Sequence, residues 1–132
     1  MKYEIEYRYF PESGHRSLFS TITGLEPEEF DHLLKPSMTG KQFINSFRSL
    51  GFSTNDRFVK FDPDTEYPVV LRCKGDSDRW WYSFMYYDGI IWDPHNNEFY
   101  KLKDIKDMRY IKRRYYFTQY RLRITSMLQV WI

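Results

Sequence analysis

Residues 3–9 alternate apolar and charged positions, with an aromatic or aliphatic side chain at every odd position. A repeat of two places successive side chains on opposite faces of an extended chain. The pattern therefore predicts a half-buried β-strand at the start of the chain. The turn-forming residues 11–14, PESG, end it.

The next forty residues carry helical spacing. Leu18, Phe19 and Ile22 share one helical face, and Gly24 is suited to end that helix. Pro27 suits the first position of a second, short helix over residues 27–34. These patterns predict two helices before residue 35.

A third helix is expected over residues 39–50. Thr39 and Gln42 have the spacing of a capping box, in which each side chain accepts a hydrogen bond from the other residue's backbone. An apolar stripe follows at helical intervals, and Gly51 ends it. The stripe consists of Phe43, Ile44, Phe47 and Leu50.

Beyond Gly51 the spacing changes to short runs rich in aromatic and β-branched residues, separated by turn residues. Asp88-Gly89 lies between two such runs and predicts a tight hairpin, because a type I′ turn needs positive φ at both positions. In 109–124 the apolar positions switch from odd to even near Thr118, which predicts a break there. The expected runs are 57–61, 67–73, 80–87, 90–92 and 98–102. The order predicts a single α+β domain over residues 1–132, with an N-terminal strand and helices followed by a twisted antiparallel β-sheet.

Composition supports a sheet-rich core. Aromatic residues make up 20% of the 132 residues, and alanine is absent. Flat rings pack well across neighbouring strands. No apolar run approaches a membrane span, the first ten residues lack the apolar core of a signal peptide, and Cys73 is the only cysteine. We therefore expect a cytoplasmic protein without disulfides.

Charge is unevenly spread along the chain. Residues 1–100 hold 11 basic and 16 acidic residues, whereas residues 101–132 hold nine and two. The basic residues of this arm alternate with tyrosines, and Arg113 and Arg114 lie at its centre. Cations and rings together bind single-stranded nucleic acid by phosphate neutralisation and base stacking. Nucleic acid is therefore an alternative partner, although basic residues also protect the exposed edge of a sheet.

The helix-then-sheet order resembles a minimal papain-like cysteine peptidase domain, of the kind found in bacteriocin-processing peptidases. "TITGLEPEEF" and "TGKQFINSFRSLGF" resemble the end of the family's first helix with its sequel, and its third helix. "RWWYSFMYYDGIIWDP" is similar to the hairpin that bears the family's histidine and its Asp-Pro pair. The likeness covers roughly residues 13–124 and implies a papain-like fold.

The resemblance also implies that the catalytic groups are missing. Counting back from Gly24 places Gly14 at the nucleophile position, and the histidine position falls near Trp81 or Tyr82. Asp93 matches the third catalytic position. Papain-type chemistry needs a thiolate beside an imidazole. We therefore expect an inactive relative, a pseudoenzyme, with no catalytic residue.

The individual residues that could act in catalysis or metal binding are better explained by structural roles. His95 is expected in a surface turn, His32 has no spaced metal-ligand partner, and Cys73 is expected as a small buried hydrophobe. Ser13 and His15 are neighbours in the sequence, which does not make them a catalytic dyad. The acidic loop 60–68 lacks the spacing of a calcium site. No metal or cofactor is expected.

The resulting hypothesis is a protein-binding or inhibitory module. The composition suits an AT-rich coding sequence, as in many phages, so an inhibitor of a host or competitor protein is the specific expectation. The binding surface is expected on the aromatic hairpin, at Trp80, Trp81, Tyr82, Trp92 and Asp93. Both faces of that hairpin could instead be core. An enzyme with relocated catalytic residues is a further alternative.

Overall fold

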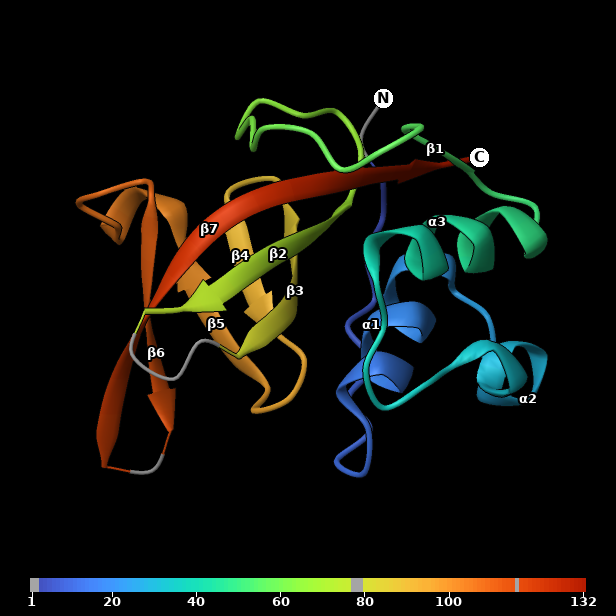
Figure 1. Ribbon diagram of the computed structural model, residues 1–132, viewed down its shortest axis with the longest axis horizontal. Helices are drawn as coiled ribbons and strands as arrows, with labels where there is room; N and C mark the ends of the chain where they lie inside the picture. The colour runs from blue at the N-terminus through green and yellow to red at the C-terminus, as the bar shows by residue number, and fades with distance from the viewer. Residues whose placement is uncertain (1–2, 77–79, 116) are drawn as a thin grey trace.

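A computed structural model describes residues 3–76, 80–115 and 117–132. Helices gather on one side and an antiparallel sheet on the other, with the chain passing from the first layer to the second after α3 (Figure 1). The α+β class and the helix-before-sheet order are therefore confirmed.

The helices begin and end where their local signals place them. Helix α1 spans Gly14–Thr23, is capped by the Ser13 hydroxyl and ends at Gly24, whose φ is 73°. Helix α2 spans Pro27–Phe30 and continues as a 3-10 turn over Asp31–Leu33. Helix α3 spans Gly40–Ser49 and carries the full Thr39–Gln42 capping box.

The sheet is antiparallel throughout its described pairs. Its seven described strands include the Asp88-Gly89 hairpin, whose two φ angles are 47° and 83° as a type I′ turn requires. Strand order is β1-β7-β2-β3-β4-β5, and β6 also pairs with β7. The strands are β1 (Ser53–Thr54), β2 (Val69–Gly75), β3 (Trp81–Tyr87), β4 (Ile90–Asp93), β5 (Glu98–Lys101), β6 (Tyr110–Tyr115) and β7 (Thr118–Trp131). The chain reverses between β6 and β7, which confirms the expected break near Thr118.

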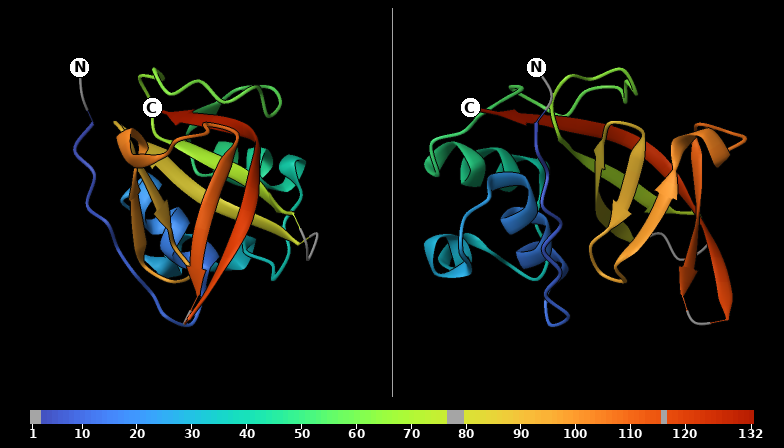
Figure 2. Two further views of the ribbon diagram at one scale, coloured as in Figure 1. Left: turned by 90° about the vertical axis from the view of Figure 1, so that its left-hand side faces the viewer. Right: turned by 180° about the vertical axis from the view of Figure 1, so that it is seen from behind.

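Strand β7 organises the sheet. It pairs with β6 over its first half, with β2 over its second half and with β1 at its end. Its register against β2 shifts between Arg72 and Cys73, which are opposite Ser126 and Ile124. Bulges of this kind bend a strand and increase its twist. The long strand curves across the whole sheet in all views (Figures 1 and 2).

Two hydrophobic clusters result from this curvature. The first lies between the helices and the sheet, and Phe43 and Phe47 of α3 pack there with Val70, Met85 and Trp92. The second lies within the curled sheet and joins Phe84 and Tyr86 of β3 to residues of β6 and β7 such as Ile111 and Leu122. Both rows of the inner hairpin are therefore core, and the second row is covered by strands rather than by a helix.

The predicted N-terminal strand is wrong. Residues 3–10 run along the junction between the helices and the sheet (Figure 2) without joining a ladder. Their backbone amides donate to side chains instead: Tyr3 to the Tyr87 hydroxyl, Arg8 to Thr21 Oγ1 and Phe10 to Ser17 Oγ. The alternating side chains still have an inner row, because Tyr3, Ile5 and Tyr7 pack against the first cluster. The run 57–61 likewise forms only a single bridge, from Val59 to Met127.

Within the described residues, no helix is long and apolar enough to cross a membrane.

Candidate binding cleft

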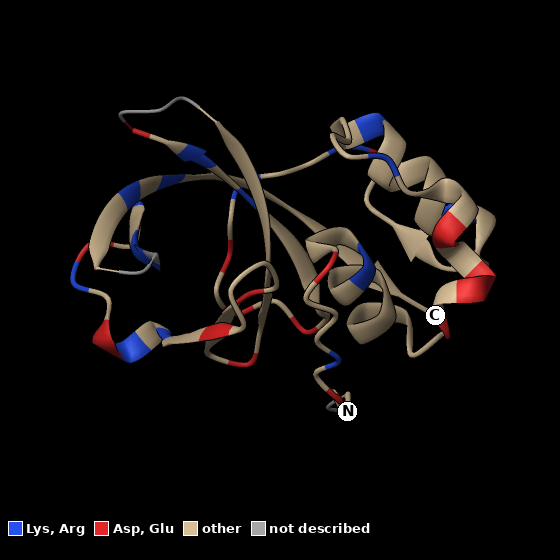
Figure 3. Cartoon of the chain, turned by 90° about the horizontal axis from the view of Figure 1, so that it is seen from below, with Lys and Arg blue, Asp and Glu red and all other residues tan. Residues whose placement is uncertain are grey.

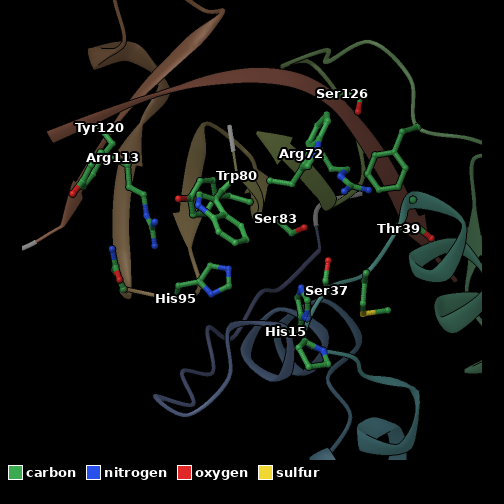
Figure 4. A pocket seen from close by; sticks show the side chains of 17 residues that line it. His15, Ser37, Thr39, Arg72, Trp80, Ser83, His95, Arg113, Tyr120 and Ser126 are labelled. Atoms are coloured by element: carbon green, nitrogen blue, oxygen red, sulfur yellow. The ribbon is translucent and has the colours of Figure 1, made fainter. Parts of the chain in front are cut away.

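A cleft of about 1150 Å³ opens between the helices and the sheet. Residues 36–40, which lead into α3, form one wall together with His15 of α1. The other wall comes from β2, β3, β6 and β7, and side chains from both walls point into the space between them (Figure 4).

One end of the cleft is held by a buried ion pair, and we call Gly14, Asp93, His95 and Arg113 the closed end. Asp93 is fully buried, and its Oδ2 accepts a hydrogen bond from Arg113 Nε at 2.9 Å. Its Oδ1 accepts the backbone N–H groups of His95 and Asn96 at 2.9 and 3.3 Å. The guanidinium of Arg113 also lies 4.6 Å from the Tyr82 ring centroid. Both charges of the pair therefore have partners.

His95 fills the space beside Gly14 at the start of α1. A Cβ at position 14 would lie 2.7 Å from Cγ of His95 and closer still to Nδ1 and Cε1. Real Cβ atoms do not approach heavy atoms so closely. Any side chain at position 14 would thus displace this imidazole. The structure corrects the expected surface position of His95, because its ring is partly buried inside the cleft.

Two imidazoles face each other across this end. The rings of His15 and His95 have centroids 6.3 Å apart. Nδ1 of His15 lies 2.8 Å from the Lys35 carbonyl oxygen, so Nδ1 carries the proton and Nε2 is an acceptor. Burial lowers the pKa of both histidines. The hydrogen bond to Lys35 opposes this for His15 and the Asp93 carboxylate opposes it for His95, whereas the charges of Arg72 and Arg113 add to it. Both rings are therefore neutral at pH 7.

The opposite end has a different character, and we call Gly40, Phe58, Arg72 and Trp81 the open end. The Arg72 guanidinium lies 4.9 Å from the Trp81 ring centroid and 5.7 Å from that of Phe58. Its Nε is buried without a hydrogen-bond partner, and no ion pair joins it to a described residue. Burial lowers its pKa from the ordinary arginine value. Sequence reasoning missed this residue; an arginine inside the apolar run VVLRC was the signal.

The outer end of the aromatic hairpin forms the rim of the cleft. Trp80 is 70% exposed and Trp81 51% exposed, whereas Phe84 and Met85 further along β3 are fully buried. Trp80, Trp81 and Tyr82 all line the cleft. The hairpin is thus divided along its length, with exposed rings at one end and core at the other.

The remaining predicted contact residues lie elsewhere. Trp92 is fully buried in the first cluster and donates from Nε1 to Asn97 Oδ1, so it is core and not surface. Asp93 is inside the closed end and not at its surface. Arg113 lines the cleft, but Arg114 is outside it, paired with Glu98 at 3.4 Å. The structure therefore brings together Trp80, Trp81, Tyr82 and Arg113, and separates Trp92 and Arg114 from them.

Acidic positions lie near basic ones along the basic arm (Figure 3), and four of its arginines pair with carboxylates of the described residues. Arg109 pairs with Asp107 at 3.0 Å, and Arg121 pairs with Asp76. A second hollow, of about 630 Å³, lies beside β6 and is lined by tyrosines and lysines together with Asp104 and Asp107. The arm therefore offers less uncompensated positive charge than its sequence suggests.

Neither thiol nor metal chemistry is evident in the described residues. Cys73 is fully buried in the second cluster, and burial raises the pKa of its thiol. A thiol in that environment is neither a nucleophile nor a ligand. No group of three or more His, Cys, Asp or Glu side chains is placed to hold a metal ion within the part of the chain that is described.

No family model, curated protein or solved structure matches this chain. The resemblance to papain-like peptidases therefore stays a prediction.

Proposed function

We propose that the chain is a non-catalytic binding domain, which holds a segment of a partner protein in the cleft between the helices and the sheet. The observation that carries this proposal is the pair of exposed tryptophans, Trp80 and Trp81, at the rim of the cleft. Tryptophan supplies large contact area at little entropic cost and is enriched among residues that dominate binding energy. The rings of Phe84, Tyr86 and Tyr87 in the same hairpin are buried, so the exposure of these two tryptophans is not required by the core.

The arrangement of the closed end supports the absence of papain-type catalysis. The positions that the resemblance assigns to the catalytic groups, 14, 81 or 82, and 93, border this cleft or its closed end. Gly14 provides no nucleophile, and His95 occupies the space that a nucleophilic side chain would need. A papain-like scaffold with an occupied catalytic position is consistent with a pseudoenzyme and with an inhibitory role.

An enzyme with relocated residues has less support. The cleft contains two imidazoles and the hydroxyls of Ser37, Ser83 and Ser126. Nucleophilic catalysis needs a hydrogen bond between nucleophile and base. Among the described residues no hydrogen bond joins one of these hydroxyls to His15 or His95.

The proposal is tested by capture of partners on the immobilised protein, with nuclease present, followed by affinity measurement. Replacing Trp80 or Trp81 with Ala should weaken partner binding by about 2 kcal/mol, some thirtyfold, because a rim ring is lost. The melting temperature should stay nearly unchanged, since both rings are exposed.

Phe117 supplies the matched control. It is fully exposed and does not line the cleft, so Phe117→Ala should leave binding intact. Equal binding by all three variants and the wild type would refute the proposal.

A further inference from the structure

Arg72 is a charged group for which folding provides no counterpart. The side chain of Arg72 is half-buried, and the buried part of a guanidinium normally has acceptors, because removing its N–H groups from water costs free energy unless hydrogen bonds replace the water. The rings of Phe58 and Trp81 cover the guanidinium but offer no acceptor to its N–H groups. Its Nε is buried and unsatisfied.

The side chains around Arg72 do not provide an anion either. The lining of the cleft contains Arg72, Arg113 and two histidines, and no Asp or Glu among its described members. Arg113 is neutralised by Asp93 at the closed end. The electrostatic character of the open end is therefore positive, and its N–H groups are suited to an acceptor brought by a ligand.

Helix α3 adds to this character. A Cβ at Gly40, the first residue of α3, would lie 3.7 Å from Nη1 of Arg72 and 3.1 Å from a Phe58 ring carbon. The amide end of a ten-residue helix, which carries partial positive charge, thus lies against the arginine. The lack of a side chain at Gly40 leaves room for the Phe58 ring beside the helix start.

We propose that the open end of the cleft binds an acidic peptide segment, whose carboxylate pairs with Arg72 while a neighbouring side chain of the segment stacks on Trp80 or Trp81. This assignment rests on the proposed binding function and names the chemistry of the partner. Arginine and carboxylate form bidentate hydrogen bonds, which are among the stronger polar contacts in proteins.

A peptide fits the cleft better than a nucleic-acid strand does. Strand binding depends on neutralising several phosphates in succession. The open end presents one arginine without an acidic partner, whereas the arginines at 109, 113, 114 and 121 are paired with carboxylates. Two cations lie over the Trp81 ring, Arg72 and Lys74, and of these Arg72 lines the cleft whereas Lys74 does not. A cleft with this arginine between aromatic rings is suited to a single carboxylate flanked by apolar groups.

The test uses the full chain and an array of decapeptides. Each peptide with Asp or Glu has a matched peptide, its twin, in which Asn or Gln replaces the acidic residue. Every peptide is made with a free and with an amidated C-terminus, so that binding through a side-chain carboxylate can be distinguished from binding through the terminal carboxylate. Wild-type protein should bind its best acidic peptides at least tenfold more tightly than their twins, a difference of about 1.4 kcal/mol. The preference should weaken as salt is added.

Two variants locate the contact. Arg72→Met should abolish the acidic preference while some binding to aromatic peptides remains, and Arg72→Lys should retain part of it. Arg114→Met is the matched control, because Arg114 is outside the cleft and should not affect the preference. Circular dichroism melting verifies that each variant is folded.

The outcomes separate the two proposals. Equal binding of acidic peptides and their twins, or an acidic preference that survives Arg72→Met, overturns the inference and leaves the binding function in place. Failure to bind any peptide overturns both the acidic-peptide inference and the proposed binding function. Binding of a twenty-nucleotide oligothymidylate, with no peptide binding, would instead support the nucleic-acid alternative.

Discussion

The closed and open ends of the cleft both contain an arginine beside aromatic rings, yet the two arginines have opposite surroundings. Arg113 lies over Tyr82 and donates to the fully buried Asp93. Arg72 lies over Trp81 and Phe58 without any carboxylate partner among the described residues. Rings alone do not replace the hydrogen bonds that a guanidinium loses on burial. The first arginine therefore contributes to folding, and the second is available for recognition.

The largest effect is expected from breaking the closed end. Asp93→Asn removes the charge opposite Arg113 and should lower the free energy of unfolding by about 3–5 kcal/mol, because a buried guanidinium is left uncompensated. Urea denaturation measures the loss. Glu98→Gln removes the partner of the exposed Arg114 and should cost less than about 1 kcal/mol. Equal losses of unfolding free energy in the two variants would show that the buried Asp93–Arg113 pair stabilises the fold no more than the exposed Glu98–Arg114 pair does.

A smaller loss is expected at Gly14. Gly14→Ala should lower the free energy of unfolding by about 1–3 kcal/mol, because the new methyl group overlaps the His95 ring. Alanine otherwise stabilises a helix relative to glycine by roughly 0.5–1 kcal/mol. In a His95→Ala background the same substitution should therefore become neutral or stabilising. A stabilising effect in the wild-type background would mean that His95 is not held against α1.

The open end should respond in the opposite direction. Arg72→Met keeps an unbranched apolar stem and removes the half-buried guanidinium whose Nε lacks an acceptor, so the free energy of unfolding should rise by about 1 kcal/mol. Arg113→Met, the same change at the closed end, should lower it by about 3–5 kcal/mol because Asp93 loses its partner. Thermal melts of the two variants give the comparison directly. A loss of stability in Arg72→Met would place this residue with Arg113 as a structural group.

The smallest effect is expected from pH. Burial lowers the pKa of His15 and His95 below the ordinary value of 6.5, so the unfolded chain binds protons more readily than the folded one. The stability that these rings contribute should be complete above about pH 6.5 and decline as pH falls towards their lowered pKa values. A double His15→Gln, His95→Gln variant should show a shallower decline between pH 6.5 and 5. Identical slopes would contradict the burial of the two rings.

Elements with local signals could be predicted from the sequence. The capping box of α3 joins residues three apart, and the Asp88-Gly89 turn depends on the φ angles of two adjacent residues. The N-terminal segment could not be predicted, because the acceptors for its amides come from Ser17, Thr21 and Tyr87, which folding brings to it. The alternation of apolar and charged residues identifies which side chains of an extended segment face the core. It does not identify the groups that accept hydrogen bonds from the backbone of that segment.

The candidate site was only partly predictable, because a sequence pattern identifies the residue types but not the residues that folding places beside them. Trp80, Trp81 and Tyr82 could be singled out as a dense run of rings, but a repeat of two does not tell which ring a core will cover. Trp92 was therefore assigned to the surface although it is core. The role of Arg72 in recognition follows from the absence of a carboxylate among its described spatial neighbours. The fold determines those neighbours, and the sequence around position 72 does not reveal them.

Strand β7 also sets the order in which the protein can form during synthesis. Strands β1 and β6 have β7 as their described pairing partner, and β2 has it on one side. All three are synthesised before residues 118–131. Until β7 is made, the helices and the hairpin can assemble only a partial sheet, with one edge of β2 exposed to other chains. Translation speed over the last strand would therefore influence how much of the protein is folded and how much aggregates.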